Sequence, residues 1–254
     1  MFEAKIAKAS LLKKIIEAIK ELISEAKFEC TPSGMTLQAM DAAHVSLVAL
    51  LLRADAFEEY RCDRNISLGI NLEIMAKVLK GAANDDCVTL RAEDDGDTVT
   101  FIFESKNKIT HFEMKLLDID SDTLGIPDVE YKSVIKMPSA EFQKTCSHLS
   151  IWGDSVTISS SKDGIKFSVD GEQGNCKMDF KQDSDTDDGV VLEVSDKLTL
   201  SFALKKLCAF TKASSLSATV RLSMSDDVPL AVEYKCEEMG YIRYFLAPKI
   251  DEDA

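Results

Sequence analysis

The sequence has little that would place it in a membrane or on a secretory route. Its longest apolar run, from Val45 to Leu52, is far shorter than the roughly 20 residues that a membrane-spanning helix needs. The first ten residues, MFEAKIAKAS, contain no apolar stretch typical of a signal peptide. We therefore expect an intracellular, soluble protein with no membrane partner.

Clustered metal ligands and paired cysteines are also missing. The seven cysteines contain no CxxC pair, and the three histidines, His44, His111 and His148, are dispersed. An odd number of scattered cysteines is typical of a reducing compartment, and a zinc site needs ligands close together. The sequence therefore predicts free thiols, no metal and no cofactor.

No motif in the chain predicts catalysis. The patterns GxxxxGKS/T, GxGxxG, HExxH and GxSxG are absent. Two acidic stretches, starting at Asp118 and Asp183, resemble calcium loops only at their first positions. Neither has glycine at position six or glutamate at position twelve, which a calcium loop requires. We interpret both as solvated loops, and we expect no catalytic residues and no enzyme.

What the chain does have is an internal repeat. The segment from Leu12 to Leu37 aligns with the segment from Phe142 to Phe167 at an offset of 130 residues. A second window, from Leu68 to Leu90, aligns with Leu200 to Leu222 at an offset of 132. Two such windows in the same order predict two copies of one domain. Within the 254 residues we expect domains at 1–116 and 133–254, the second with a short acidic tail, and an interdomain linker at 117–132.

Four segments show helical periodicity, each with an apolar face and a polar face that carries lysine. We expect helices near Leu11–Ile23, Asn71–Gly81, Ser139–Ser150, where Ser139 starts the helix and faces outward, and Ala203–Lys212. These segments hold nine lysines and four glutamates, a net charge of +5, although the whole chain carries −14. On one helix a lysine face can simply be solvated, but its recurrence on all four favours an anionic partner such as a phosphate backbone.

The remaining sequence alternates apolar and polar residues in short runs separated by the turns PSG, DDGD and KDG. This pattern predicts an α+β fold in which each domain is mainly antiparallel sheet with two helices on one side. The predicted linker is acidic but also presents Leu124, Ile126 and Tyr131. An apolar strip of this kind suggests a docking surface.

Many short stretches spread over essentially the whole chain carry a resemblance to one family. They are MFEA, LKK, LQAMDAAHVSLV, YRCDRN, LRAED, FEMKL, LGIP, VIKMPSAEF, KDGIKFS, FTKAS, LSMSDDVPL, VEYK and LAPKI. In these the sequence resembles the eukaryotic DNA sliding clamps of the proliferating cell nuclear antigen family. The resemblance implies a ring of three subunits whose helices line a hole around duplex DNA.

By that resemblance, lysines of the four helices contact DNA phosphates without reading sequence. They are Lys13, Lys14, Lys20, Lys77, Lys80, Lys144, Lys205 and Lys212. The third helix departs from the family pattern, because Ser147 stands where a basic residue is usual and His148 where an acidic one is usual.

The resemblance also implies a pocket for short docking peptides with an aromatic or aliphatic plug. It maps onto Met40, His44, Val45, Leu47, Leu124, Ile126, Pro127, Tyr131, Pro229, Ala247, Pro248 and Ile250. For Val45 and Leu47 alone, an ordinary core role is the simpler interpretation. Contacts between subunits are implied for the alternating residues of two strands, Thr110, Phe112, Met114, Cys176, Met178 and Phe180. Lys162 matches the family's site for ubiquitin-type attachment.

The implied function is a nuclear, homotrimeric processivity factor that recruits a replicative DNA polymerase, a clamp loader, a flap nuclease, a ligase and other replication and repair proteins. One alternative is a subunit of a heterotrimeric, checkpoint-type clamp. Another, from a different class, is a hydrolase or metal-dependent enzyme built on a repeated fold. Metal-dependent or nucleotide-dependent turnover would favour that second alternative.

Overall fold

The chain folds into two compact units, which are described here one at a time. The computed structural model describes residues 1–120, 124–126, 129–183, 189–236 and 238–249. The first unit contains residues 1–42, 48–125 and 236–242, and the second contains residues 43–47, 126–235 and 243–254. Each unit therefore includes a short segment from the other half of the sequence.

The first unit begins with a strand, a helix and a strand, and this pattern is repeated before its end. Its elements are β1 (Phe2–Ile6), α1 (Ala9–Ile19), β2 (Glu25–Thr31), β3 (Gly34–Met40), a 3-10 turn η1 (Ala54–Ala56), β5 (Glu59–Cys62), β6 (Ile66–Asn71), α2 (Leu72–Leu79), β7 (Cys87–Ala92), β8 (Thr98–Ser105) and β9 (Lys108–Lys115). Two further strands, β4 (Ser46–Arg53) and β18 (Gly240–Leu246), have residues in both units.

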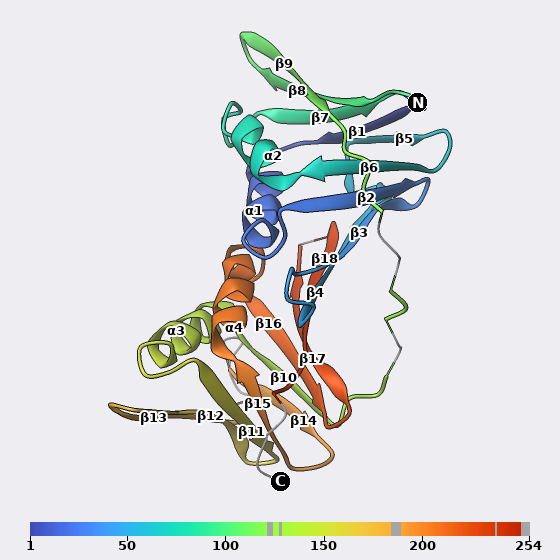
Figure 1. Cartoon of the computed structure of the whole chain (residues 1–254). Coiled ribbons are helices and arrows are strands. Elements are labelled where there is room, and N and C mark those ends of the chain that lie inside the picture. Colours follow the sequence, from blue (N-terminus) through green and yellow to red (C-terminus); the bar gives the residue numbers. More distant parts are fainter. Residues whose placement is uncertain (121–123, 127–128, 184–188, 237, 250–254) are drawn as a thin grey trace. The chain divides into compact units, whose positions relative to one another are not determined.

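Antiparallel pairing organises the strands of the first unit. Five strands form a sheet in the order β5-β1-β7-β8-β9, and β2 pairs with both β3 and β6. Helices α1 and α2 contact each other and lie on the same side of the strands (Figure 1). Apolar side chains from α1, such as Leu12 and Ile15, meet Phe28 and Leu90 of the strands in the interior. Burying these side chains between helices and strands is what stabilises the unit.

The second unit has the same architecture. Its elements are β10 (Ser133–Pro138), α3 (Ser139–Leu149), β11 (Ser155–Ser161), β12 (Gly164–Gly171), β13 (Gly174–Lys181), β14 (Val191–Val194), β15 (Leu198–Ala203), α4 (Leu204–Phe210), a 3-10 helix η2 (Thr211–Leu216), β16 (Thr219–Ser225) and β17 (Val228–Lys235). Strands β13-β12-β11-β15 form one sheet, and β14, β10, β16 and β17 are neighbours in that order in another.

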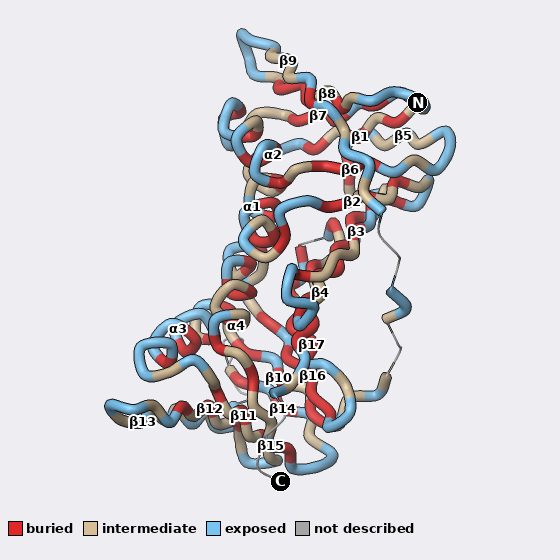
Figure 2. The backbone as a smooth tube through the Cα atoms, viewed as in Figure 1, coloured by how far each residue is buried: buried red, intermediate tan, exposed pale blue. Residues whose placement is uncertain are grey.

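The internal repeat predicted from the sequence is confirmed by these orders. Neighbours β5-β1-β7-β8 in the first unit correspond to β14-β10-β16-β17 in the second, and β6-β2-β3 corresponds to β15-β11-β12. Each unit is mainly antiparallel sheet with two α-helices, as predicted. The three predicted turns also form, because PSG joins β2 to β3, DDGD joins β7 to β8, and KDG joins β11 to β12. Figure 2 shows buried segments alternating with exposed ones along the strands.

The helix boundaries differ from the predicted ones by up to four residues, most of all at the end of α1. Helix α1 ends at Ile19 with Lys20 as its C-cap, although the apolar pattern continues to Ile23, which is buried beyond the helix. Helix α4 ends at Phe210, and Lys212 lies in η2 instead. The periodicity continues in both cases because the following segment still packs on the core.

The start of α3 corrects a second prediction. Ser139 does not face outward: it is 2% exposed, and Pro138 occupies the N-cap. Its hydroxyl has no hydrogen-bond partner among the residues that the structure describes. By contrast, Asn71 caps α2, because its side-chain oxygen accepts a hydrogen bond from the Ile74 amide at 3.0 Å. Asparagine is among the preferred residues at this position.

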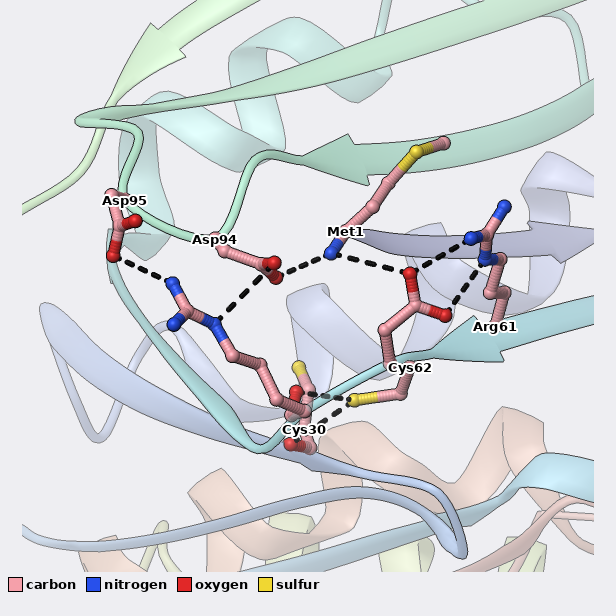
Figure 3. A network of polar contacts seen from close by, with 8 residues as sticks. Met1, Cys30, Arg61, Cys62, Asp94 and Asp95 are labelled. Carbon is pink, nitrogen blue, oxygen red and sulfur yellow. Dashed lines mark hydrogen bonds and ion pairs between the residues drawn. The ribbon is translucent and has the colours of Figure 1, made fainter.

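A charged network joins three chain segments at one end of the first unit (Figure 3). The Met1 amine forms ion pairs with Asp94 and Asp63. The Asp63 carboxylate also pairs with Arg61, with an Oδ1–Nε distance of 2.8 Å. Arg64 contacts Asp94 and Asp95. The hydrogen bond from the Met1 amine lowers the pKa of Asp94, and the same bond raises the pKa of the amine. The network fixes the start of β1 to the turns after β5 and β7.

Within the described parts of the chain, no helix is long and apolar enough to cross a membrane. Those same parts bring together no group of three or more histidine, cysteine, aspartate or glutamate side chains that could hold a metal ion. All seven cysteines are free thiols. Burial raises the pKa of Cys30, and it raises the pKa of Cys146 well above its ordinary value. These two thiols are therefore poor nucleophiles.

Candidate functional site

The first unit presents lysines along α1 and α2. Lys14 on α1 and Lys77 on α2 are exposed, as is Lys80, which is the C-cap of α2. The two helices lie side by side (Figure 1), so their polar faces can form one positively charged surface. The alternating burial within each helix explains this arrangement, since Ile15, Ile16 and Met75 point into the core.

Lys13 and Lys20, which are among the predicted lysines of this unit, have partners in the protein. The Nζ of Lys13 donates a hydrogen bond to the Ala82 carbonyl oxygen at 2.6 Å and another to Asn84 Oδ1 at 3.3 Å. Lys20 forms an ion pair with Glu17, with an Nζ–Oε2 distance of 2.7 Å. Lys13 therefore helps to hold α1 against the segment that follows α2, while its charge still contributes to the local field.

The second unit also presents lysines from its helices. Lys144 on α3, Lys205 on α4 and Lys212 on η2 are exposed. Lys144 pairs with Glu141, with an Nζ–Oε1 distance of 2.8 Å. Ser147 and His148 are exposed as well, so α3 offers less positive charge than α1.

Chemically, these lysines can hold phosphate groups but cannot read bases. Ion pairs between exposed side chains contribute little, typically about 0–1 kcal/mol, so a phosphate can compete with Glu17 or Glu141 for its lysine. Ammonium groups on flexible side chains act as point charges without the planar geometry that reads base edges. The arrangement fits a partner with a regular phosphate backbone.

Two of the residues predicted for a peptide pocket, Val45 and Ala247, lie beside each other in the second unit. In the second unit, the Ala247 amide donates a hydrogen bond to the Val45 carbonyl oxygen at 3.1 Å, which holds segment 43–47 beside the chain after β18. Val45 is 41% exposed. His44 has a φ of 55°, in the left-handed region, at the turn before β4. This turn presents the Val45 side chain to solvent.

The other predicted pocket residues vary in exposure. Leu47, Ile126, Tyr131 and Pro248 are half-buried, and Pro229 and Ala247 are exposed. Burial raises the pKa of Tyr131. Met40 and Leu124 belong to the first unit, where Met40 is half-buried and Leu124 is 40% exposed. Pro127 and Ile250 lie outside the described residues.

The strands predicted to join subunits are both terminal strands of their sheets. β9 ends the sheet of the first unit and pairs with β8, and β13 ends a sheet of the second unit and pairs with β12. On β9, Thr110 and Phe112 are half-buried and Met114 is buried, with exposed residues between them. On β13, Cys176, Met178 and Phe180 are half-buried with the same alternation. A terminal strand leaves one row of backbone donors and acceptors available for another chain.

Two features near these sites were not predicted from the sequence. Trp152, the single tryptophan, is 42% exposed just beyond α3. A Cβ built on Gly174, the first residue of β13, would lie 3.0 Å from its ring, so the ring lies against the terminal strand. Asn84, which accepts from Lys13, was also missed. The adjacent apolar residues Ile151 and Trp152, directly after a helix, could have indicated the exposed tryptophan. No local sequence pattern indicates the hydrogen bond between Lys13 and Asn84.

Lys162 is exposed in the turn between β11 and β12. Ser161 accepts a hydrogen bond from the Asp163 amide through its hydroxyl oxygen, which orders the turn around the lysine. Its ammonium is accessible from solvent.

Comparison with protein families gives two matches that together span nearly the whole chain. Residues 1–124 match the family model described as proliferating cell nuclear antigen, N-terminal domain. Residues 125–249 match the model described as proliferating cell nuclear antigen, C-terminal domain.

Proposed function

Since this chain belongs to the proliferating cell nuclear antigen family of DNA sliding clamps, which are scaffolds and not enzymes, we propose that it works as a closed ring of three identical subunits around duplex DNA. In this role it keeps a replicative polymerase on its template and recruits other replication and repair proteins in the nucleus. The proposed partners beyond the polymerase are a clamp loader, a flap nuclease, a ligase and other proteins with short docking peptides.

The observation that carries the homotrimer proposal is the pair of terminal strands. β9 belongs to the first unit and β13 to the second. Along both strands, half-buried or buried side chains alternate with exposed ones. Two different edges on one chain allow a head-to-tail contact, and such contacts produce a ring when the rotation between subunits closes. A subunit of a heterotrimeric clamp would instead need edges that fit other chains.

The lysines of the helices support the DNA-binding part of the proposal. Exposed Lys14, Lys77, Lys80, Lys144, Lys205 and Lys212 can contact phosphates, and Lys20 can do so by leaving Glu17. Contacts of this kind carry no sequence information and weaken as salt increases. Enclosure would then provide persistence, so weak contacts are sufficient and allow sliding.

The exposed Val45 beside Ala247 supports a docking site for partner peptides in the second unit. Half-buried Leu47 and Pro248 add apolar surface there.

The accessible Lys162 suits covalent attachment of a modifier, because its turn is exposed. Domain limits at residues 1–116, 117–132 and 133–254 remain part of the proposal.

Light scattering on the purified chain tests the homotrimer. We expect a mass three times that of one chain; a stable monomer at micromolar concentration would contradict the proposal. Thr110→Glu places a carboxylate in the proposed contact row of β9 and should yield monomers. The matched control is Thr98→Glu on β8, where the new side chain would lie opposite Lys115 within the sheet. This control should remain trimeric.

A further inference from the structure

One face of the second unit concentrates positive charge that the proposed function does not use. On strands β14, β10, β16 and β17, the outward residues include Lys136, Arg221 and Lys235, all of which are exposed. None of the three forms an ion pair with any residue that the structure describes. Unpaired cations gathered on a chain with a net charge of −14 indicate a site for an anionic group.

The register of the strands places two of these cations directly opposite each other. Lys136 on β10 faces Arg221 on β16, and Arg221 in turn faces Glu233 on β17. Side chains directly opposite in antiparallel strands lie about 5 Å apart at their Cβ atoms, and like charges in such pairs are destabilising. Glu233 reduces the repulsion between Lys136 and Arg221 only in part, because it already pairs with another cation. Its Oε2 accepts a hydrogen bond of 2.9 Å from Arg243 Nε.

These side chains surround a shallow cavity of about 340 Å³. Val134 and Val191 provide an apolar part of its wall, and Glu193 adds a carboxylate. The volume lies in the range of about 300–1,000 Å³ typical of ligand sites. A guanidinium and two ammonium groups around such a cavity can donate charge-assisted hydrogen bonds to carboxylates.

Helices α3 and η2 contact the other face of these strands. The inward residues of β10, Ile135 and Met137, are buried, whereas Lys136 between them is exposed. The cation cluster therefore points away from the helix lysines of its own unit. We propose that Lys136, Arg221 and Lys235 form a docking site for an acidic peptide segment of a partner protein, on the face opposite the helix lysines of this unit.

A peptide fits this face better than a nucleic acid does. Glu193 and Glu233 would repel a continuous phosphate backbone, but they can pair with basic side chains or backbone amides between the acidic residues of a peptide. The two valines can contact aliphatic side chains. A strand-like segment with alternating acidic residues can reach cations on neighbouring strands, because alternate side chains point to the same face.

Fluorescence anisotropy with a labelled 12-residue peptide of alternating glutamate and serine tests this proposal. The full-length protein should bind it at low salt, and a peptide with glutamine in place of glutamate should not bind. The double variant Lys136→Gln and Arg221→Gln should weaken binding about fivefold or more, as expected for the loss of two surface charge contacts. Glu193→Gln should tighten binding, because it removes a repelling carboxylate.

The matched control is Lys162→Gln with Lys197→Gln, which removes the same charge from exposed positions elsewhere in the second unit. Its affinity for the acidic peptide should change less than twofold. Equal losses in the control and the Lys136/Arg221 variant would overturn the proposal, because they would show a response to net charge alone. A loss of duplex-DNA affinity with unchanged peptide affinity would also overturn it and assign the face to nucleic acid.

Discussion

Lys13 and Ala82 are joined by a hydrogen bond of 2.6 Å from the lysine Nζ to the carbonyl oxygen. The bond connects α1 to the segment after α2, so a lysine predicted to face DNA also holds the helix pair together. Because hydrogen bonds from charged donors are stronger than neutral ones, we expect the free energy of unfolding to fall by about 1–2 kcal/mol in Lys13→Met. Thermal denaturation measures this effect.

Lys77→Met is the matched control, since Lys77 is exposed on the neighbouring helix. It should leave the melting temperature unchanged and weaken DNA binding, which a salt titration of duplex affinity would detect as a shallower salt dependence. If Lys13→Met left stability intact and reduced DNA affinity as much as Lys77→Met does, the structural role of Lys13 would be wrong.

The Met1–Asp94 contact predicts a pH dependence of stability. The pKa of Asp94 is lowered in the folded state, so its contribution is present above the unfolded value of about 3.9 and is lost as pH falls through the folded pKa. The pKa of the Met1 amine is raised, so its contribution is present below the unfolded value of about 8 and is lost as pH rises through the folded pKa.

Asp94→Asn should therefore lower the melting temperature most between about pH 5 and 7, with a smaller effect near pH 3 and pH 10. Asp85→Asn, at an exposed position in the same unit, should change it little at any of these pH values. A pH-independent effect of Asp94→Asn would show that its contact with the amine does not stabilise the fold.

If the peptide site is where we propose, a substitution there should weaken peptide binding without changing retention on duplex DNA. Val45→Glu places a charge on an exposed apolar side chain and should weaken binding of an apolar docking peptide about tenfold or more, because a carboxylate would be buried under the peptide. Duplex retention and melting temperature should not change. Leu117→Glu, at a leucine that is 37% exposed in the first unit, is the control and should bind the peptide normally. Normal peptide binding by Val45→Glu would remove Val45 from the site.

Trp152 offers a direct signal of assembly. It is the single tryptophan, it is partly exposed, and its ring lies against the first residue of β13. If β13 joins a neighbouring subunit, dilution into monomers should shift tryptophan emission to longer wavelength as the ring meets more water. Emission independent of concentration across the range where light scattering reports dissociation would place Trp152 outside the contact.

The sequence predicted the architecture well because its signals are local. Hairpin turns such as that between Ser161 and Gly164 depend on a few neighbouring residues, and the apolar face of α2 follows from spacing alone. The repeat added the order of elements, which the strand neighbours of both units confirm.

What the sequence missed depends on contacts between distant residues. The partner of Lys13 lies 69 positions away, so a helical projection cannot reveal that its Nζ is occupied. Helix α1 ends at Ile19 and Ile23 is buried after the turn, while the apolar spacing continues without a break. Segments 43–47 and 236–242 are exchanged between the compact units, which no local pattern indicates.

Enclosure of duplex DNA is the central claim, and retention before and after opening a DNA circle tests it most directly. The protein is loaded by a clamp loader onto a nicked circular plasmid, separated from free protein by gel filtration, and measured again after one cut linearises the DNA. We predict retention on the circle, loss after the cut, and recovery of retention when both ends are blocked by bulky proteins. Equal retention on circular and unblocked linear DNA would contradict enclosure and show that affinity alone holds the complex.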